Sequence, residues 1–408
     1  MNTLATRISP SARRWTCAST TPSPSPCPST SASLFRHRRS SRNFSTSRRQ
    51  AADHVRIVEV GPRDGLQNEK SSIPLDTKLE LIRRLAQTGV THLEAGSFVP
   101  AKWVPQMAST SNILEQILTN PPPAPHGIAY NYLVPNIRGM ENLVKTLQTH
   151  KAQNANPSAS VSGAPPTPPP SPGPSATTIS SNPDELDANR SSSTSNSTEI
   201  SLFAAATETF SQKNTNCSIA TSLERCKPIV ELAKQHSIRV RGYVSVALGC
   251  PYEGADVDPH KVASITATLL EMGCDEVSVA DTTGMGTAPR TRKLLETLKD
   301  AGILNEDLAL HFHDTYGMAL VNTVVGLEHG VRIFDSSVGG LGGCPYSKGA
   351  TGNVATEDLL HLLHSLGCDT GVDLLKMAEI GDWISHQLGR PNDSRAGKAV
   401  LARLKDSS

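Results

Sequence analysis

Two histidines, His311 and His313, are the residues of this 408-residue chain that most clearly suggest chemistry. They lie at the end of an apolar run, residues 308–312, which is typical of a buried strand, and a turn ending in glycine follows. Successive side chains of a strand point to opposite faces, so both imidazoles share one face while Phe312 points to the other. The pair is half of a metal site; one structural histidine with an incidental neighbour is the alternative.

Two oxygen donors extend this candidate metal site. Asp64 follows an apolar strand predicted at residues 55–60, and Asn353 follows the last predicted strand. Two imidazole nitrogens and two oxygen donors without a thiolate suit Mg²⁺ or Mn²⁺ in an octahedral site, which leaves two positions for substrate. Zn²⁺ is the alternative, although it usually recruits cysteine and closes at four ligands. For Asp64 alone, a turn or helix-capping role before glycine competes with metal binding.

Three charged residues at strand ends are further candidates for catalysis. Arg63 is permanently charged and stands beside Asp64, so it suits a developing oxyanion such as an enolate oxygen. Glu94 ends the second predicted strand and either orients Arg63 or forms an ordinary salt bridge with it. Asp281 ends the sixth predicted strand and is either a base or histidine partner, or a buried structural aspartate.

A glycine-rich loop precedes the candidate catalytic cysteine, Cys344. Residues 339–343 contain four glycines, which cost conformational entropy and therefore indicate a flexible lid rather than a purely structural loop. Such a lid brings Cys344 over the site, where a nearby cation lowers its pKa and lets it donate or accept a proton. An incidental cysteine is the alternative, because Cys250 stands in a similar Gly-Cys-Pro-Tyr context.

Eight strand-then-helix units are predicted to position these residues, which favours an α/β fold of the closed (β/α)₈ TIM-barrel type over an open doubly wound sheet. The strands are predicted at residues 55–60, 92–94, 128–134, 200–206, 240–248, 277–280, 308–313 and 333–338. The helices are predicted at residues 76–87, 111–118, 138–148, 223–236, 259–272, 289–301, 319–329 and 356–366. The candidate site residues then follow strand ends, where such barrels place their active sites.

Composition divides the chain into five segments. Residues 53–150 hold the first three units and residues 199–370 the other five, while residues 371–408 are surplus and predict extra C-terminal helices. Between the two barrel parts, residues 151–198 are rich in Pro, Ser, Thr and Asn, which predicts a disordered insertion. A tolerated surface insertion is favoured over a regulatory binding segment.

Residues 1–52 contain nine arginines, no lysine and no acidic residue, which predicts a disordered mitochondrial transit peptide, with cleavage after Phe44, and residence in the mitochondrial matrix. Without this leader, the chain has 30 basic and 38 acidic residues and is therefore net negative. No basic surface that would bind nucleic acid is expected. The eight cysteines show no CxxC pair, which indicates free thiols in a reducing compartment. No apolar run reaches the roughly 18 residues of a membrane span, so no membrane association is expected.

Several motifs in the same order resemble the metal-dependent lyases and acyl-CoA synthases of the DRE-TIM group, and within it the 3-hydroxy-3-methylglutaryl-CoA lyases. The similarity covers residues 55–366 apart from the insertion. It is carried by residues 61–69 (GPRDGLQNE), 97–99, 102–107, 214–218, 241–253, 311–317 and 339–346.

This resemblance implies a TIM barrel that cleaves 3-hydroxy-3-methylglutaryl-CoA to acetyl-CoA and acetoacetate, in leucine breakdown and ketone-body formation. It implies a small-molecule CoA thioester as the partner, and a homodimer is one option for assembly. It implies four metal ligands, Asp64, His311, His313 and Asn353. It also implies substrate contact by Arg63, a catalytic Cys344, and active-site acids at Glu94 and Asp281.

Rival interpretations and departures from the family pattern accompany the resemblance. A condensing acyltransferase or an aldolase on the same barrel is the nearest enzymatic rival, and a non-catalytic metal-binding barrel is the rival of another class. The general base is Asp281, a histidine or Cys344 itself. The tail, residues 390–408, contains no cysteine, so the intersubunit thiol switch of some relatives is not expected there.

Overall fold

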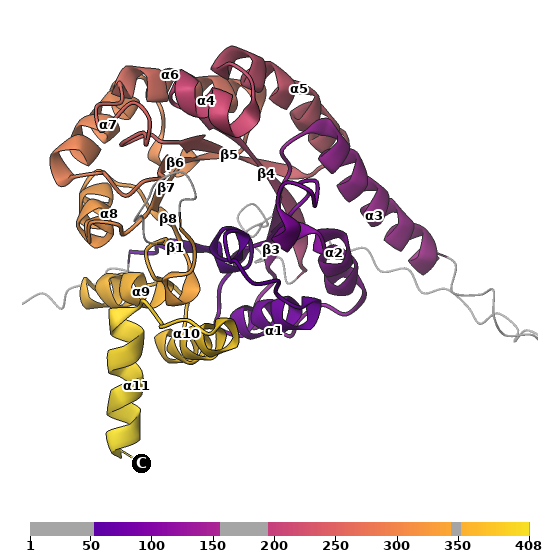
Figure 1. Ribbon diagram of the computed structural model, residues 1–408, viewed down its shortest axis with the longest axis vertical. Helices are drawn as coiled ribbons and strands as arrows, with labels where there is room; N and C mark the ends of the chain where they lie inside the picture. Colours follow the sequence, from indigo (N-terminus) through magenta and orange to yellow (C-terminus); the bar gives the residue numbers. More distant parts are fainter. Residues whose placement is uncertain (1–52, 156–194, 344–351, 408) are drawn as a thin grey trace, which may run out of the picture. The chain divides into compact units, whose positions relative to one another are not determined.

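The computed structural model describes residues 53–155, 195–343 and 352–407. Eight parallel strands close into a barrel in chain order, and helices surround it (Figure 1). The predicted (β/α)₈ fold is therefore confirmed. The strands are β1 (Arg56–Glu59), β2 (His92–Ser97), β3 (Ala129–Leu133), β4 (Ser197–Ala205), β5 (Arg239–Ser245), β6 (Glu276–Asp281), β7 (Leu308–Phe312) and β8 (Ile333–Ser336).

The helices that follow the strands match the predicted ones to within a few residues at most ends. They are α1 (Leu75–Ala86), α2 (Thr110–Thr119), α3 (Ile137–Ala155), α5 (Ile219–Gln235), α6 (Pro259–Met272), α7 (Ala288–Asp300), α8 (Ala319–Glu328) and α9 (Thr356–Ser365). Helix α6 shows the local signals well. Asp258 caps its first turn by accepting the N–H of His260 at 3.0 Å, and Gly273 ends it at a φ of 111°.

Some elements were not predicted. A short polar helix, α4 (Glu208–Thr215), precedes α5. Among the described residues there are also three 3₁₀ turns, η2 (Pro105–Met107), η3 (Asn305–Asp307) and η4 (Val338–Gly340). A π-helical turn, η1 (Gly61–Gly65), directly follows β1. The predicted C-terminal helices are present as α10 (Leu374–Leu388) and α11 (Arg395–Ser407).

The boundaries predicted for the insertion need correction at both ends. Helix α3 continues to Ala155, and β4 begins at Ser197, which pairs in register with Ala129 of β3. The side chain of Asn196 also accepts the N–H of Ile128 at 2.9 Å. Composition could not show this, because polar residues extend an existing helix or strand without changing the low-complexity pattern. The rest of the insertion and the leader lie outside the described residues.

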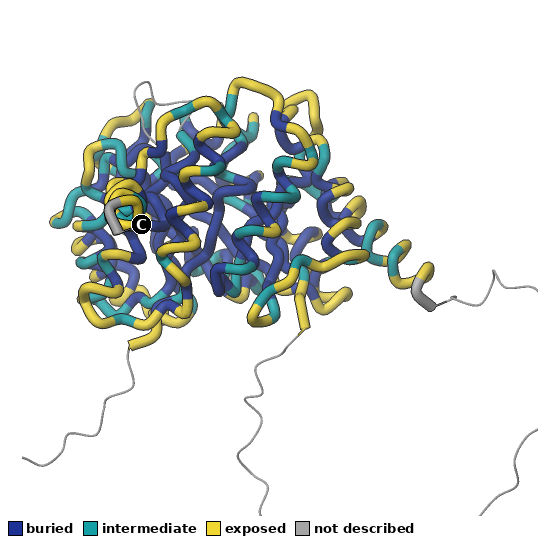
Figure 2. Tube along the Cα trace, turned by 90° about the horizontal axis from the view of Figure 1, so that it is seen from below, coloured by how far each residue is buried: buried dark blue, intermediate teal, exposed yellow. Residues whose placement is uncertain are grey.

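The hydrophobic core lies between the strands and the surrounding helices. Figure 2 shows the buried part of the chain in the middle of the barrel domain and the exposed part around it. The barrel interior is different. A separate small cluster of Val58, Val60, Ala309 and Ile333 is apolar, but other buried strand residues, including Glu94, Arg241 and Asp335, are charged. Charged side chains are almost never fully buried without partners, so the interior must be paired internally. None of the described helices combines the length and apolar character that a bilayer span demands.

Candidate active site

Four sequence-predicted ligands meet at the carboxyl ends of β1, β7 and β8. Asp64 lies in η1, where the N–H groups of residues 63–65 all donate to the carbonyl of Val60 and fold the chain back sharply. His311 lies on β7, and His313 directly follows it. Asn353 forms an isolated antiparallel bridge with His313, so the segment before α9 is held against the end of β7.

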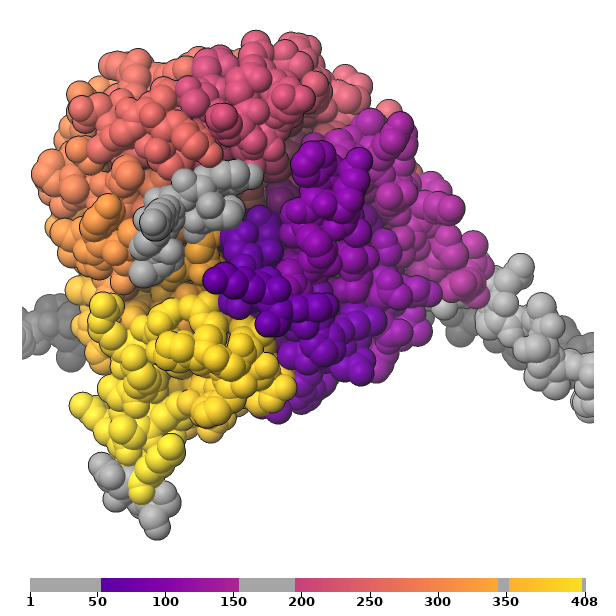
Figure 3. Space-filling model, viewed as in Figure 1, coloured from indigo at the N-terminus to yellow at the C-terminus, as the bar shows by residue number. Residues whose placement is uncertain are grey.

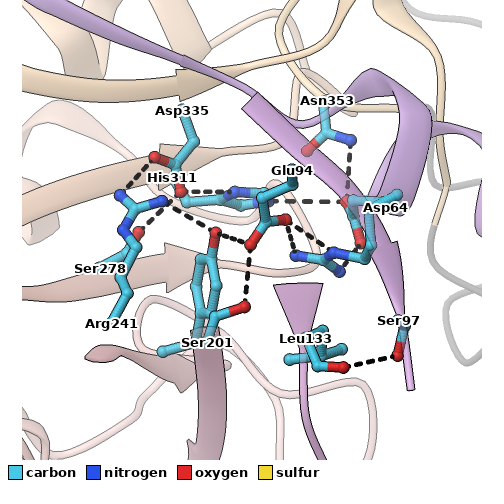
Figure 4. A network of polar contacts seen from close by, with 12 residues as sticks. Asp64, Glu94, Ser97, Leu133, Ser201, Arg241, Ser278, His311, Asp335 and Asn353 are labelled. Atoms are coloured by element: carbon cyan, nitrogen blue, oxygen red, sulfur yellow. Dashed lines mark hydrogen bonds and ion pairs between the residues drawn. The ribbon is translucent and has the colours of Figure 1, made fainter. Parts of the chain in front are cut away.

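The donor atoms of three of these residues form a compact cluster. One ligand atom each from Asp64, His311 and His313 lie within 4.8 Å of one another. His311 Nε2 is 3.9 Å from Asp64 Oδ2, and the two imidazole rings have centroids 5.3 Å apart. Asn353 joins the cluster by donating from Nδ2 to Asp64 Oδ2 at 2.9 Å (Figure 4). This spacing allows all four side chains to reach one cation.

Two buried atoms test whether this donor set fits a metal. Asn353 Oδ1 and His313 Nδ1 are buried and have no hydrogen-bond partner within the part of the chain that the structure describes. Buried polar atoms are normally satisfied, so two buried atoms without a partner beside a carboxylate are consistent with a bound ligand. Imidazole nitrogen, amide oxygen and carboxylate oxygen without thiolate suit an octahedral divalent cation.

The protonation states of the cluster favour metal binding as well. Burial raises the pKa of Asp64, but Arg63 and the two histidines outweigh burial and hold this pKa below its ordinary value. Burial, reinforced by His311, lowers the pKa of His313 to about 4. Asp64 is therefore an anion and His313 a neutral imidazole near pH 7, which are the forms that bind metals.

Arg63 is fixed beside this cluster by two carboxylates. Its Nε donates to Glu94 Oε2 at 2.7 Å, and its Nη1 donates to Asp64 Oδ1 at 2.7 Å. Glu94 is fully buried, and its second oxygen accepts from Tyr243 at 2.8 Å and from Ser201 at 3.1 Å. The structure therefore brings Glu94 to Arg63, and the contacts with Tyr243 and Ser201 hold the Glu94 carboxylate in place.

Sequence reasoning missed the residues behind His311. Asp335 on β8 lies 3.2 Å from His311 Nδ1 and accepts from Arg241 at 2.6 Å and Ser278 at 2.9 Å (Figure 4). Burial raises the pKa of Asp335, but Arg241 and His311 outweigh it and lower this pKa to about 2. A carboxylate at Nδ1 fixes the tautomer that leaves Nε2 as an acceptor facing Asp64. The available signal was an acidic residue inside a strand whose four residues are all buried, residues 333–336.

The structure does not bring Asp281 to the face of β6 that supports the cluster. Asp281 is in register with the outward-facing Phe312, whereas Ala280 is in register with His311. Its Oδ2 accepts the N–H of Gly286 at 2.8 Å and so holds its own βα loop. Burial raises the pKa of Asp281 to about 6. This geometry favours the structural alternative for Asp281.

Cys344 lies outside the described residues, so its predicted role stays a prediction. The start of the glycine-rich loop is described and lies beside the cluster. The carbonyl of Leu341 accepts from Asn353 Nδ2 at 3.1 Å, and the carbonyl of Gly343 accepts from Asn68 at 2.6 Å. The described part of the loop that leads to Cys344 therefore contacts Asn353, a candidate metal ligand.

Comparison with known proteins is consistent with this geometry. The family model described as HMGL-like matches residues 54–157 and 175–384. A 3-hydroxy-3-isohexenylglutaryl-CoA/hydroxy-methylglutaryl-CoA lyase of Pseudomonas aeruginosa is 46% identical over 349 residues, 86% of this chain and 98% of that protein. The mitochondrial hydroxymethylglutaryl-CoA lyase of Rattus norvegicus is 44% identical over 350 residues, 85% of this chain and 89% of that protein.

A solved structure agrees with these sequence relatives. The crystal structure of hydroxymethylglutaryl-CoA lyase from Pseudomonas aeruginosa superimposes with a TM-score of 0.70 at 44% identity, covering 86% of this chain and 99% of that one. The prediction of a carbon–carbon lyase is confirmed. This chain belongs to the HMGL-like family, that of the hydroxymethylglutaryl-CoA lyases.

Proposed function

We propose that this protein cleaves 3-hydroxy-3-methylglutaryl-CoA to acetyl-CoA and acetoacetate with Mg²⁺ or Mn²⁺ as cofactor. The proposed ligands are Asp64, His311, His313 and Asn353. One observation carries the proposal, namely the Asp64–His311–His313 cluster beside a guanidinium that Glu94 holds in place. The names of the relatives support the choice of substrate.

The reaction is a retro-Claisen cleavage. A base takes the proton of the C3 hydroxyl, with Asp281, a histidine and Cys344 as the candidates for this base. The C2–C3 bond then breaks, and its electron pair moves into the thioester as an enolate while the C3 oxygen becomes the ketone of acetoacetate. A divalent cation held by the four ligands supplies Lewis-acid polarisation of the substrate oxygens. Arg63 stabilises the enolate oxygen as its charge develops, because a fixed, permanently charged donor needs no reorganisation in the transition state.

Arg63 has the geometry for this task. A guanidinium has five N–H groups. The contacts of Nε, Nη1 and Nη2 with Glu94 and Asp64 use one on each nitrogen, so two more can face the substrate. Glu94 acts as a positioning residue in this proposal. The proton that finally converts the enolate carbon to a methyl group comes from Cys344, as the sequence predicts.

An acetoacetate assay tests the proposal directly. The full chain is incubated with 3-hydroxy-3-methylglutaryl-CoA after EDTA treatment, and then again after Mg²⁺ or Mn²⁺ is added back. We expect acetoacetate and acetyl-CoA in equal amounts only when metal is present, and an Asp64→Asn variant should be inactive under both conditions. Full activity in EDTA, or activity of Asp64→Asn equal to wild type, would overturn the cation site.

We also propose the mitochondrial matrix as the location of the protein. The arginine-rich, acid-free leader at residues 1–52 supports this, together with the similarity to a mitochondrial relative. Fusion of residues 1–52 to a fluorescent reporter tests it. We expect the reporter to enter mitochondria and its leader to be removed. A variant with the nine arginines replaced by glutamine should stay in the cytosol.

A further inference from the structure

The C-terminal connector, defined here as residues 389–394 between α10 and α11, contacts two loops of the active site. Arg390 Nη1 donates to Glu69 Oε1 at 2.9 Å, and Glu69 belongs to the loop that follows β1 and η1. Arg390 Nη2 donates to Asp393 Oδ2 at 2.5 Å, and the backbone N–H of Asp393 donates to the carbonyl of Gly339 at 3.1 Å. One short segment therefore joins the loops after β1 and β8.

The connector is itself anchored to the barrel through α9. The hydroxyl of Ser394, which is fully buried, donates to Asp358 Oδ1 at 2.7 Å, and the N–H of Ala396 donates to the same atom at 2.6 Å. Asp358 thus caps the start of α11 and fixes the connector at the same time. Figure 3 shows the C-terminal residues, in yellow, packed against the N-terminal part of the barrel, in indigo.

Gly339 is held from its other side as well. Its N–H donates to both carboxylate oxygens of Glu357, at 3.1 and 2.9 Å, while its carbonyl is bound by the connector. Its φ of 65° lies in the left-handed region, which favours glycine. Both polar groups of this residue are therefore fixed, one by α9 and the other by the C-terminal connector.

The contacts continue from Gly339 to the proposed ligands. Two residues later, the carbonyl of Leu341 accepts from Asn353 Nδ2, which also donates to Asp64 Oδ2. A carbonyl can only accept, so it dictates which end of the amide is the nitrogen and leaves Oδ1 for a cation. The connector therefore holds the loops on both sides of the Asp64–Asn353 contact.

We propose that Arg390 and Asp393 are positioning residues that set the separation of Asp64 and Asn353 from outside the barrel. The inference rests on the cation site proposed above and assigns a task to the segment that is surplus to the eight barrel units. Residues that orient metal ligands without touching the metal commonly change its affinity, so the consequence is measurable as Mn²⁺ binding.

The test compares Mn²⁺ affinity, measured by electron paramagnetic resonance on the full chain, among variants of this ion pair. We expect Arg390→Ala to weaken Mn²⁺ binding by roughly three- to tenfold. This is a smaller effect than expected from removing a residue that hydrogen-bonds directly to a metal ligand. Glu69→Gln should match it, the double variant should lose no more than either single one, and Arg390→Lys should recover part of the loss.

Two control variants separate positioning from general destabilisation. Arg395→Ala removes an exposed arginine of the same region, whose ion pair with Asp314 spans 3.5 Å. Ile380→Val removes one methylene from the buried face of α10 without touching the connector. We expect wild-type Mn²⁺ affinity from both, even where Ile380→Val lowers the melting temperature.

The outcomes distinguish this inference from the proposed function. If the wild-type protein binds Mn²⁺ and Arg390→Ala and Glu69→Gln bind it equally well, this inference is overturned and the cation site stands. If the wild-type protein binds no Mn²⁺, both fall. Equal weakening in Arg390→Ala and Ile380→Val would mean that the connector acts only through stability and would also overturn the inference.

Discussion

Asp335 lies directly behind His311, with its Oδ2 3.2 Å from the imidazole Nδ1, and the same carboxylate is bound by Arg241. The pair links the proposed cation site to the charged interior of the barrel. His311 is thus held in one tautomer by a residue on the neighbouring strand, in register at the His311–Asp335 pair of β7 and β8.

Asp335→Asn should therefore weaken Mn²⁺ binding by about ten- to a hundredfold, because the imidazole loses a charged acceptor that fixes its tautomer and raises its basicity. Electron paramagnetic resonance of Mn²⁺ measures the change. Ser278→Ala is the matched control, since it removes one neutral donor to the same carboxylate and should change affinity far less. Equal effects of the two variants would argue against an orienting role for Asp335.

Arg63→Gln should lower kcat by about a hundred- to a thousandfold while leaving KM within a few fold, because its interaction strengthens only as the enolate charge develops. Steady-state kinetics of acetoacetate formation checks the split. Arg290→Gln serves as the control, since that arginine is partly exposed, 3.8 Å from Asp256, and its hydrogen bond goes to the carbonyl of Met285 at 3.2 Å. A normal kcat for Arg63→Gln would remove Arg63 from the chemical step.

Gly381→Ala should destabilise the protein, although alanine is favoured over glycine inside a helix by about 1 kcal/mol. A Cβ at this position of α10 would collide with Glu357 Oε1, the oxygen that binds Gly339. Overpacking of this kind costs about 1–3 kcal/mol, so the sign of the expected effect reverses. Thermal unfolding measures it, and a raised melting temperature would contradict the described packing.

The stability of the metal-free protein should fall as pH rises from about 6.5 to about 8.5. Burial raises the pKa of Glu59 to about 7 and that of Glu357 to about 8, against an ordinary value of 4.5. The folded chain then holds protons that the unfolded chain has released, so this stability is complete below about pH 4.5 and is lost as pH rises through about 7 to 8.

Melting temperatures across this pH range, measured in EDTA, check the sign. Glu357→Gln keeps an acceptor for Gly339 but cannot ionise, so it should flatten the decline. Glu224→Gln changes an exposed carboxylate and should leave the slope as it is. A melting temperature that rises between about pH 6.5 and 8.5 in the wild-type protein would contradict the prediction.

The alternation of apolar strands and amphipathic helices was sufficient to predict the barrel. The polar residues that end those strands were sufficient to predict that Asp64, His311, His313 and Asn353 meet. Each of these inferences uses only local periodicity and the known direction of parallel strands. Helix α4 escaped because it is short and Phe210 is its only large apolar residue.

The residues that hold the site residues in place could not be predicted from local sequence patterns. Asp335 and Arg241 lie on different strands, and their pairing depends on strand register across the barrel, which sequence spacing does not encode. The same holds for Arg390 and Glu69, which are 321 positions apart. Sequence placed Asp281 correctly at a strand end but could not show which face of β6 its carboxylate occupies.

The position of the insertion has a practical consequence for engineering this chain. Helix α3 leads into β4 at the amino-terminal end of the barrel strands, whereas His311 and Asp64 lie at the carboxyl ends. The insertion between α3 and β4 therefore joins the barrel at the end opposite the candidate active site. A dye, affinity tag or whole reporter domain joined there would track the enzyme while leaving turnover unaltered.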